Sequence, residues 1–169
     1  SEITMKQQGP NNHGFTLIEV LISLLIFGVG IIGVTALTTQ SQKITYQAYQ
    51  SMVATWQLHD MMELIRANAS QASGSNKYVH SYQGTEARGT KDCIANECSA
   101  SEMADYDIRL WLSGTSNALP SAEGTVSRAA SAYTLTLYWD GKQTGSTATP
   151  ETDCGDETTL LCQKFEFEL

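Results

Sequence analysis

The chain has 169 residues, enough for about one domain with a core of its own, and this length argues against a multidomain enzyme. Its 10 Lys and Arg residues stand against 18 Asp and Glu residues, so the formal net charge is -8 and the pI is about 4.7. Most faces of such a protein repel a phosphate backbone, and no nucleic acid partner is expected.

The charges are unevenly distributed along the chain. Between Gln7 and Gln42 the only formally charged side chain is Glu19, and residues 15–37 form an apolar run of 23 residues. As a helix, this run is long enough to cross a hydrocarbon core about 30 Å thick. It exceeds the h-region of a secretory signal, about 7–15 residues, and no small-residue cleavage site follows it. We therefore expect the apolar segment to remain in the mature protein.

Three glycines inside this run, Gly28, Gly30 and Gly33, match the G-x-G-x-x-G spacing of dinucleotide-binding proteins. A dinucleotide site also needs a second strand and an acid about 20 residues further on, which binds the ribose. No carboxylate lies between Glu19 and Asp60. We expect no cofactor, and interpret the glycines as positions where a membrane helix packs closely or bends.

Glu19 places a carboxylate four residues into the apolar run, where its burial costs about 2.5–3.5 kcal/mol unless a partner or the membrane interface relieves it. The surrounding residues read Gly14-Phe15-Thr16-Leu17-Ile18-Glu19-Val20-Leu21. They resemble the class III signal of type IV pilins and related pseudopilins, with Gly before the cleavage point and Glu fifth in the mature chain.

This resemblance implies that residues 1–14 are a leader, which a prepilin peptidase removes by cleavage between Gly14 and Phe15. It also implies N-methylation of the new Phe15 amine. During assembly, Glu19 would meet the N-terminal amine of a neighbouring subunit, which is the kind of partner that a buried carboxylate requires.

Residues 38–69 contain no Gly or Pro and are expected to continue the helix as an amphipathic segment. A helix over residues 15–68 would be roughly 80 Å long, so its N-terminal half should project from the head. The family resemblance implies the same lollipop shape. The predicted core stripe is Ile44, Ala48, Leu58, Met62, Ile65 and Ala69, with Ala54, Met61 and Trp56 beside it.

The head is assigned to residues 70–169. Residues 70–91 are rich in Ser, Gly and Thr and predict a loop with at most a short strand at residues 78–82. Ser99 and Glu102 form a capping-box pattern, which predicts a helix ending at about Ser113. Its predicted apolar face is Met103, Ala104, Ile108, Trp111 and Leu112.

The rest of the head predicts β-structure. Residues 133–139 alternate between apolar and polar side chains, and Asp140-Gly141 predicts a turn. A last strand should point Phe165, Phe167 and Leu169 inward, and residues 124–127 are a candidate third strand. The predicted fold class is α+β, in which a long N-terminal helix packs into a head with a small antiparallel sheet.

Four cysteines lie in the head, and their residue type alone allows disulfides, a zinc site or plain core positions. The spacings C-x4-C and C-x7-C lack the C-x2-C element of common zinc modules, and no metal is expected. An even count suits an oxidising compartment. We favour the pairs Cys93–Cys98 and Cys154–Cys162, because each brackets a short polar loop and because pilins resembling this chain close a loop near the C-terminus. Chain entropy alone favours longer bridges, so connectivity stays open.

Other candidate sites have weaker support. His59 and Glu63 form an i, i+4 pair, which is expected to be a solvated helix face rather than a metal site. The acidic residues Glu151, Asp153, Asp156 and Glu157 resemble the calcium-holding loops of some pseudopilins but lack EF-hand spacing. A nucleophile elbow and a phosphate loop are both missing from the sequence, so no enzymatic activity is expected.

The head also resembles minor pilins of the PilV type. The shared features are a cysteine pair, a helix containing residues 105–111, Leu119-Pro120, a turn containing Gly124, and a strand ending in Tyr138-Trp139. The resemblance implies a minor pilin that helps to initiate pilus assembly at the tip, with other minor pilins, the major pilin and an adhesin, and that supports twitching motility and attachment.

Such a protein would span the bacterial inner membrane once, with its head in the periplasm, before it enters the fibre. Two alternatives stay open. A minor pseudopilin of a type II secretion system shares the N-terminal signal. A membrane-anchored periplasmic binding protein or enzyme would keep the helix without cleavage after Gly14.

Overall fold

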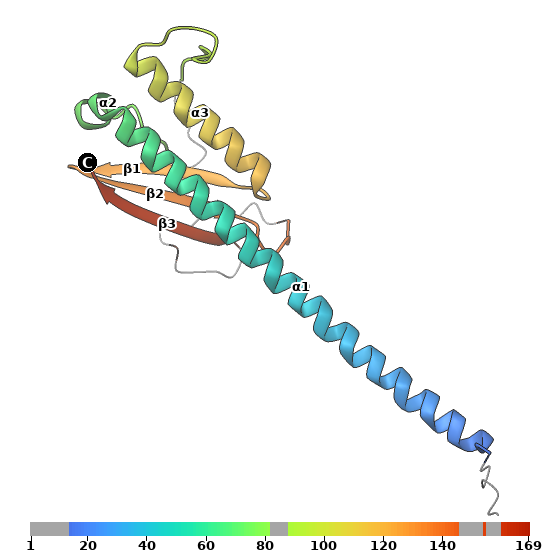
Figure 1. Ribbon diagram of the computed structural model, residues 1–169. Coiled ribbons are helices and arrows are strands. Elements are labelled where there is room, and N and C mark those ends of the chain that lie inside the picture. The colour runs from blue at the N-terminus through green and yellow to red at the C-terminus, as the bar shows by residue number, and fades with distance from the viewer. Residues whose placement is uncertain (1–13, 82–87, 146–153, 155–159) are drawn as a thin grey trace, which may run out of the picture. The chain divides into compact units, whose positions relative to one another are not determined.

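The computed structural model describes residues 14–81, 88–145, 154 and 160–169, and its elements are shown in Figure 1. The chain divides into two compact units, Ser1–Ile44 and Thr45–Leu169. Three features of the sequence lie outside the described residues: the predicted leader ahead of Gly14, Tyr82 at the end of the predicted short strand, and the acidic residues Glu151, Asp153, Asp156 and Glu157.

Helix α1 runs from Leu17 to Ala67 without interruption. It begins after Thr16, whose carbonyl accepts the backbone N–H groups of Glu19 and Val20 and whose hydroxyl also accepts from Glu19 N at 3.4 Å. A Thr in this position satisfies N–H groups that the first helical turn cannot pair internally. The predicted continuation of the apolar segment as one helix is confirmed.

The segment after α1 differs from the prediction. A six-residue helix, α2 (Ala69–Gly74), replaces the start of the predicted loop. Long-range contacts stabilise it: Arg128 donates to the carbonyls of Ser73 and Ser75, and Tyr133 Oη donates to Ala72 O at 2.8 Å. Because these partners lie more than 50 residues away, local composition did not predict the helix.

The core stripe of α1 is also partly different from the prediction. Leu58, Met62 and Ile65 are buried, as are Ala54 and Met61. Ile44 and Trp56, however, are 56% and 60% exposed, and Ala48 and Ala69 are exposed too. The head covers α1 only along the face that contains Gln50, Val53 and Ala54 and continues to Ile65, so the predicted stripe extended too far at both ends.

Helix α3 (Ala100–Ala118) begins with the predicted capping box. Ser99 Oγ accepts from Glu102 N at 3.3 Å, and the Glu102 carboxylate accepts from Ser99 N at 2.8 Å. The helix runs five residues beyond the predicted end at Ser113, because buried Thr115 continues the spacing of Ile108 and Trp111. It ends at Leu119, the residue before Pro120, where a proline disfavours helical backbone.

Three antiparallel strands form the sheet in the order β1-β2-β3: β1 (Glu123–Ala129), β2 (Ala132–Trp139) and β3 (Leu161–Glu168). Gly124 lies within β1 rather than in a turn, and the chain reverses at Pro120 and Ser121 instead. Of the three side chains predicted to point inward on β3, Phe167 is buried, Phe165 is half-buried and Leu169 is exposed.

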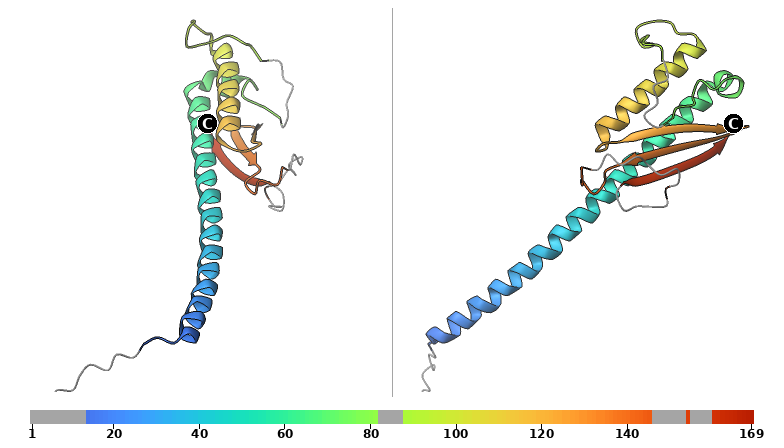
Figure 2. Two further views of the ribbon diagram at one scale, coloured as in Figure 1. Left: turned by 90° about the vertical axis from the view of Figure 1, so that its right-hand side faces the viewer. Right: turned by 180° about the vertical axis from the view of Figure 1, so that it is seen from behind.

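The core of the second unit lies between this sheet and the helices α1 and α3, which cover one face of the sheet (Figure 2). Tyr133, Leu135 and Leu137 on β2 are fully buried there. Of the predicted strand at residues 78–82, His80 forms a single bridge with Val126 on the outer edge of β1. The α+β class with a long N-terminal helix and a small antiparallel sheet is confirmed.

Candidate functional site

The predicted processing site lies immediately before α1. Gly14 and Phe15 are both exposed, Phe15 at 82%, and no heavy atom lies within 4 Å of the Cβ position of Gly14. Glu19 follows in the first turn of α1, where a negative charge is favourable because of the helix dipole. Both residues that flank the predicted cleavage bond are therefore exposed at the start of the first unit.

The first unit exposes an unusually large apolar surface. Every large apolar side chain from Leu17 to Leu37 is about half exposed or more, from 48% at Val20 to 79% at Leu17. α1 is long and apolar enough to cross a membrane. An apolar surface of this size is unfavourable in water and must be covered by lipid or by other apolar helices.

The hydroxyl groups of Ser23 and Thr35 within this surface are hydrogen-bonded inside the helix. Ser23 Oγ donates to Glu19 O at 2.7 Å, and Thr35 Oγ1 donates to Ile31 O at 2.9 Å. Their hydroxyl groups therefore need no water, which suits a helix that enters an apolar environment.

The three glycines lie in the middle of this helix and follow no strand, so the structure lacks the strand–turn–helix of a dinucleotide site. Open space surrounds each glycine Cβ position within 4 Å. Around Gly30, the side chains of Ile26, Phe27, Ile31 and Val34 line a shallow groove. A second helix can approach the backbone closely at such a position.

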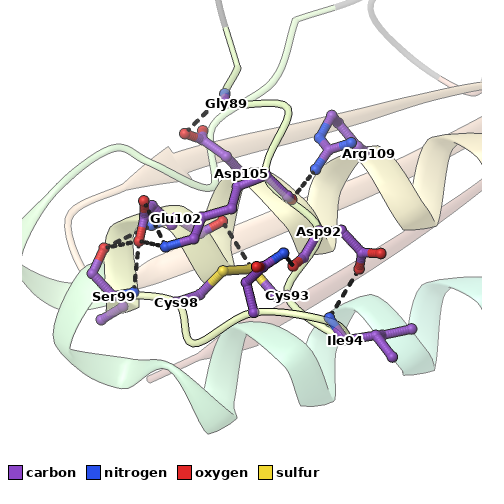
Figure 3. The surroundings of a disulfide bond; sticks show 12 residues. Gly89, Asp92, Cys93, Ile94, Cys98, Ser99, Glu102, Asp105 and Arg109 are labelled. Carbon is purple, nitrogen blue, oxygen red and sulfur yellow. Dashed lines mark hydrogen bonds and ion pairs between the residues drawn. A yellow bond between two sulfur atoms is a disulfide. The ribbon is translucent and has the colours of Figure 1, made fainter.

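The head contains two disulfides, Cys93–Cys98 and Cys154–Cys162. The first closes an exposed loop immediately before α3, shown in Figure 3. The second joins Cys154 to Cys162 on β3. Cys162 lies opposite Tyr138 of β2 in the sheet. Among the described residues, no group of three or more His, Cys, Asp or Glu side chains is arranged to hold a metal.

His59 and Glu63 have separate contacts. The His59 ring packs against Phe165 with 4.9 Å between centroids, and Glu63 pairs with Arg66 at 3.5 Å. Both side chains therefore have ordinary structural contacts on the surface of the head.

Two buried acids on α3 were missed by the sequence reasoning. Asp105 accepts from Gly89 N at 3.2 Å and lies 3.6 Å from both Lys77 and Arg88. Asp107 accepts from Tyr78 Oη at 2.7 Å. Together these acids attach Lys77, Tyr78, Arg88 and Gly89 to α3.

The burial of Asp107 could have been predicted from its position along the helix. It lies four residues from both Met103 and Trp111, on the predicted apolar face of the helix. Burial raises the pKa of Asp107, although the hydrogen bond from Tyr78 acts in the opposite direction. Burial and the neighbouring Asp107 raise the pKa of Tyr78 as well.

Comparison with known families gives two matches. Residues 9–35 match the prokaryotic N-terminal methylation motif, a segment that includes Gly14, Phe15 and Glu19. Residues 36–109 match the family described as type IV pilin Tt1218, a segment that extends from α1 through the Cys93–Cys98 loop into α3. No curated protein and no solved structure matches the chain significantly.

Proposed function

We infer that this chain is a type IV pilin with a prepilin-type N-terminal signal, and we propose that it is a minor pilin, which helps to initiate pilus assembly. The observation that carries the proposal is the exposed apolar segment Leu17–Leu37, which holds a single charged side chain, Glu19, immediately after the processing signal. Its role is structural, with no cofactor.

Processing comes first. Prepilin peptidase cleaves the exposed bond between Gly14 and Phe15, and the new Phe15 amine is methylated. The mature chain then begins with a positive charge followed by the apolar helix, with Glu19 as its fifth residue. In the inner membrane, lipid covers the helix and the head lies in the periplasm.

Assembly replaces lipid by neighbouring helices. A carboxylate that leaves the membrane interface for an apolar interior needs a positive partner, and the Phe15 amine of an adjacent subunit supplies one. The groove at Gly30 allows close contact between helices during the same step. Glu19 therefore acts as an assembly residue, whose pairing selects the register between subunits.

The minor-pilin assignment is supported by the likeness of the head to PilV-type heads, in the Cys93–Cys98 pair, the helix over residues 105–111 and the strand ending in Tyr138-Trp139. In this role the chain joins other minor pilins and an adhesin in a complex at the tip of the fibre. Pilus number, twitching motility and attachment then depend on it.

The test combines gene deletion with a count of subunits in sheared fibres. Deletion should lower the number of fibres even when retraction is blocked, and quantitative mass spectrometry should find few copies of this chain for each copy of the main fibre subunit. A copy number equal to that of the main subunit would contradict the minor role. Normal fibres together with a loss of protein secretion would favour the pseudopilin alternative.

A further inference from the structure

The Cys93–Cys98 loop exposes Ile94 to an unusual degree. At 84%, Ile94 is the most exposed large apolar side chain among the residues that the structure describes, above even Phe15 at 82%. Within the second unit the next values are much lower, with Trp56 at 60% and Leu110 at 54%.

Local bonds restrict the conformation of the loop. The disulfide closes it with 5.5 Å between the Cα atoms of Cys93 and Cys98. Two residues of the ring also bond to Asp92, immediately before it: the Ile94 N–H donates to Asp92 Oδ1 at 2.9 Å, and Asn96 Nδ2 donates to Asp92 O at 3.0 Å. Figure 3 shows Ile94 extending from this closed loop.

Helix α3 holds both ends of the loop. Arg109 donates to Lys91 O at 2.7 Å on one side, and the Ser99–Glu102 capping box anchors the other. Lys91 also pairs with Glu102 at 3.1 Å. A side chain on a loop held this firmly loses little freedom when it enters a partner, so contact with Ile94 contributes more of its energy to binding.

The charges around Ile94 indicate what kind of partner fits. Asp92 and Glu97 are exposed and flank Ile94 in the sequence, whereas Lys91 is held against Glu102. A second copy of this chain, with a net charge of -8, would be repelled. Complementarity requires an apolar socket with Lys or Arg at its rim.

The loop lies at the end of the head where α1 stops and α3 starts, since Asn68 Nδ2 donates to Ala100 O at 2.7 Å. We propose that the Cys93–Cys98 loop docks Ile94 into an apolar socket, rimmed by Lys or Arg, on the head of another pilin subunit. The proposal rests on the proposed function, because the partner belongs to the same assembly.

The experiment uses the processed chain in detergent, with helix α1 intact. It measures binding to each of the other pilin subunits of the same system, which are purified and immobilised one at a time. Ile94→Ser should weaken binding to one of them about tenfold to a hundredfold, as expected for the loss of one buried aliphatic side chain. Leu110→Ser is the matched control, an exposed Leu on α3 changed in the same way, and should alter Kd less than twofold.

Two further variants test whether the disulfide that restricts the loop and the negative charge at Glu97 contribute to binding. The double variant Cys93→Ser, Cys98→Ser releases the loop and should also weaken binding, while the other disulfide stays intact. Glu97→Lys should weaken binding and reduce its dependence on salt, because it places a positive charge against a basic rim.

Three results would overturn the proposal: Ile94→Ser binding every subunit with the Kd of the wild type, no subunit binding the wild type, or Ile94 mediating only self-association. Sheared fibres separate this proposal from the proposed function. If Ile94→Ser binds the subunits with the Kd of the wild type and is incorporated normally into fibres, the docking site is refuted but the minor-pilin role is not. Absence of the wild-type chain from fibres refutes the minor-pilin role.

Discussion

Tyr78 donates a hydrogen bond from its Oη to Asp107 Oδ2 at 2.7 Å, which joins the segment after α2 to the buried face of α3. Both residues are buried, Tyr78 completely. A buried carboxylate with a single neutral donor is a costly arrangement, and its burial explains the raised pKa of Asp107.

The first prediction concerns this pair. Because the folded pKa of Asp107 lies above the ordinary value of 3.8, the native state binds the proton more tightly than the unfolded state. Its contribution to the free energy of unfolding is greatest below pH 3.8 and falls as the pH rises through the folded pKa. Asp107→Asn removes this decline and keeps an acceptor for Tyr78, so its Tm at pH 7 should equal or exceed that of the wild type.

Thermal unfolding of the full chain, followed by circular dichroism between pH 3 and pH 8, checks this prediction. The difference between Asp107→Asn and the wild type should shrink below pH 4. As a control, Tyr78→Phe leaves the carboxylate without its donor and should cost about 1–3 kcal/mol at pH 7. A variant Asp107→Asn with a lower Tm than the wild type at pH 7 would show that the carboxylate is stabilising there.

The second prediction concerns Glu102, whose pKa is lowered to about 2, first by the backbone N–H of Ser99 and then by Lys91. A lowered folded pKa means that the stabilisation is complete above the ordinary pKa of 4.5 and is lost as the pH falls toward 2. Glu102→Gln should therefore lower the Tm at pH 7 but leave it unchanged near pH 2.

The same pH series measures this effect, with Glu97→Gln as the control for an exposed acid outside the capping box. If Glu97→Gln and Glu102→Gln gave the same dependence of Tm on pH, the capping box would have no specific role.

The third prediction concerns Gly124 on β1, over which the Trp111 ring packs. A Cβ atom at Gly124 would overlap the ring, while Trp111 Nε1 donates to Gln57 O at 2.8 Å. Gly124→Val should therefore displace the indole and lower the free energy of unfolding by about 1–3 kcal/mol. Denaturant unfolding followed by Trp fluorescence measures the loss.

Gly114→Ala is the matched control, because a Cβ there would lie 3.7 Å from Gln57, an ordinary contact. On the helix, this change should be neutral or stabilising by up to about 1 kcal/mol. Equal stability of Gly124→Val and the wild type would mean that Trp111 finds another position at no cost.

The fourth prediction concerns Glu19. Since Glu19 is exposed and belongs to the first unit, whereas the core of the head belongs to the second, Glu19→Ala should leave the Tm of the head unchanged. The same variant should be cleaved before Phe15 but should reach sheared fibres at a level reduced at least tenfold. Intact mass and immunoblots of fibres measure the two steps.

Ile18→Ala is the neighbouring control, because it shortens an apolar side chain and keeps the charge. Wild-type incorporation of Glu19→Ala would rule out pairing between Glu19 and the Phe15 amine of an adjacent subunit.

The sequence by itself determined the features that depend on residues close together in the chain. The signal around Gly14, Phe15 and Glu19 spans six residues and agrees with the matched methylation motif. The capping box joins residues three apart, and burial alternates with a period of two over residues 132–135 of β2. Each pattern is local chemistry, because the groups that satisfy one another lie within one turn or one strand.

The tertiary structure decided the features whose partners are distant in the chain. Helix α2 depends on Arg128 and Tyr133, which accounts for a helix where composition predicted a loop. Trp56 is exposed because the sheet and α3 cover a different face of α1. Asp107 is buried because Tyr78, 29 residues away, supplies its donor. In each case the packing of one element on another, rather than local preference, selects the final conformation.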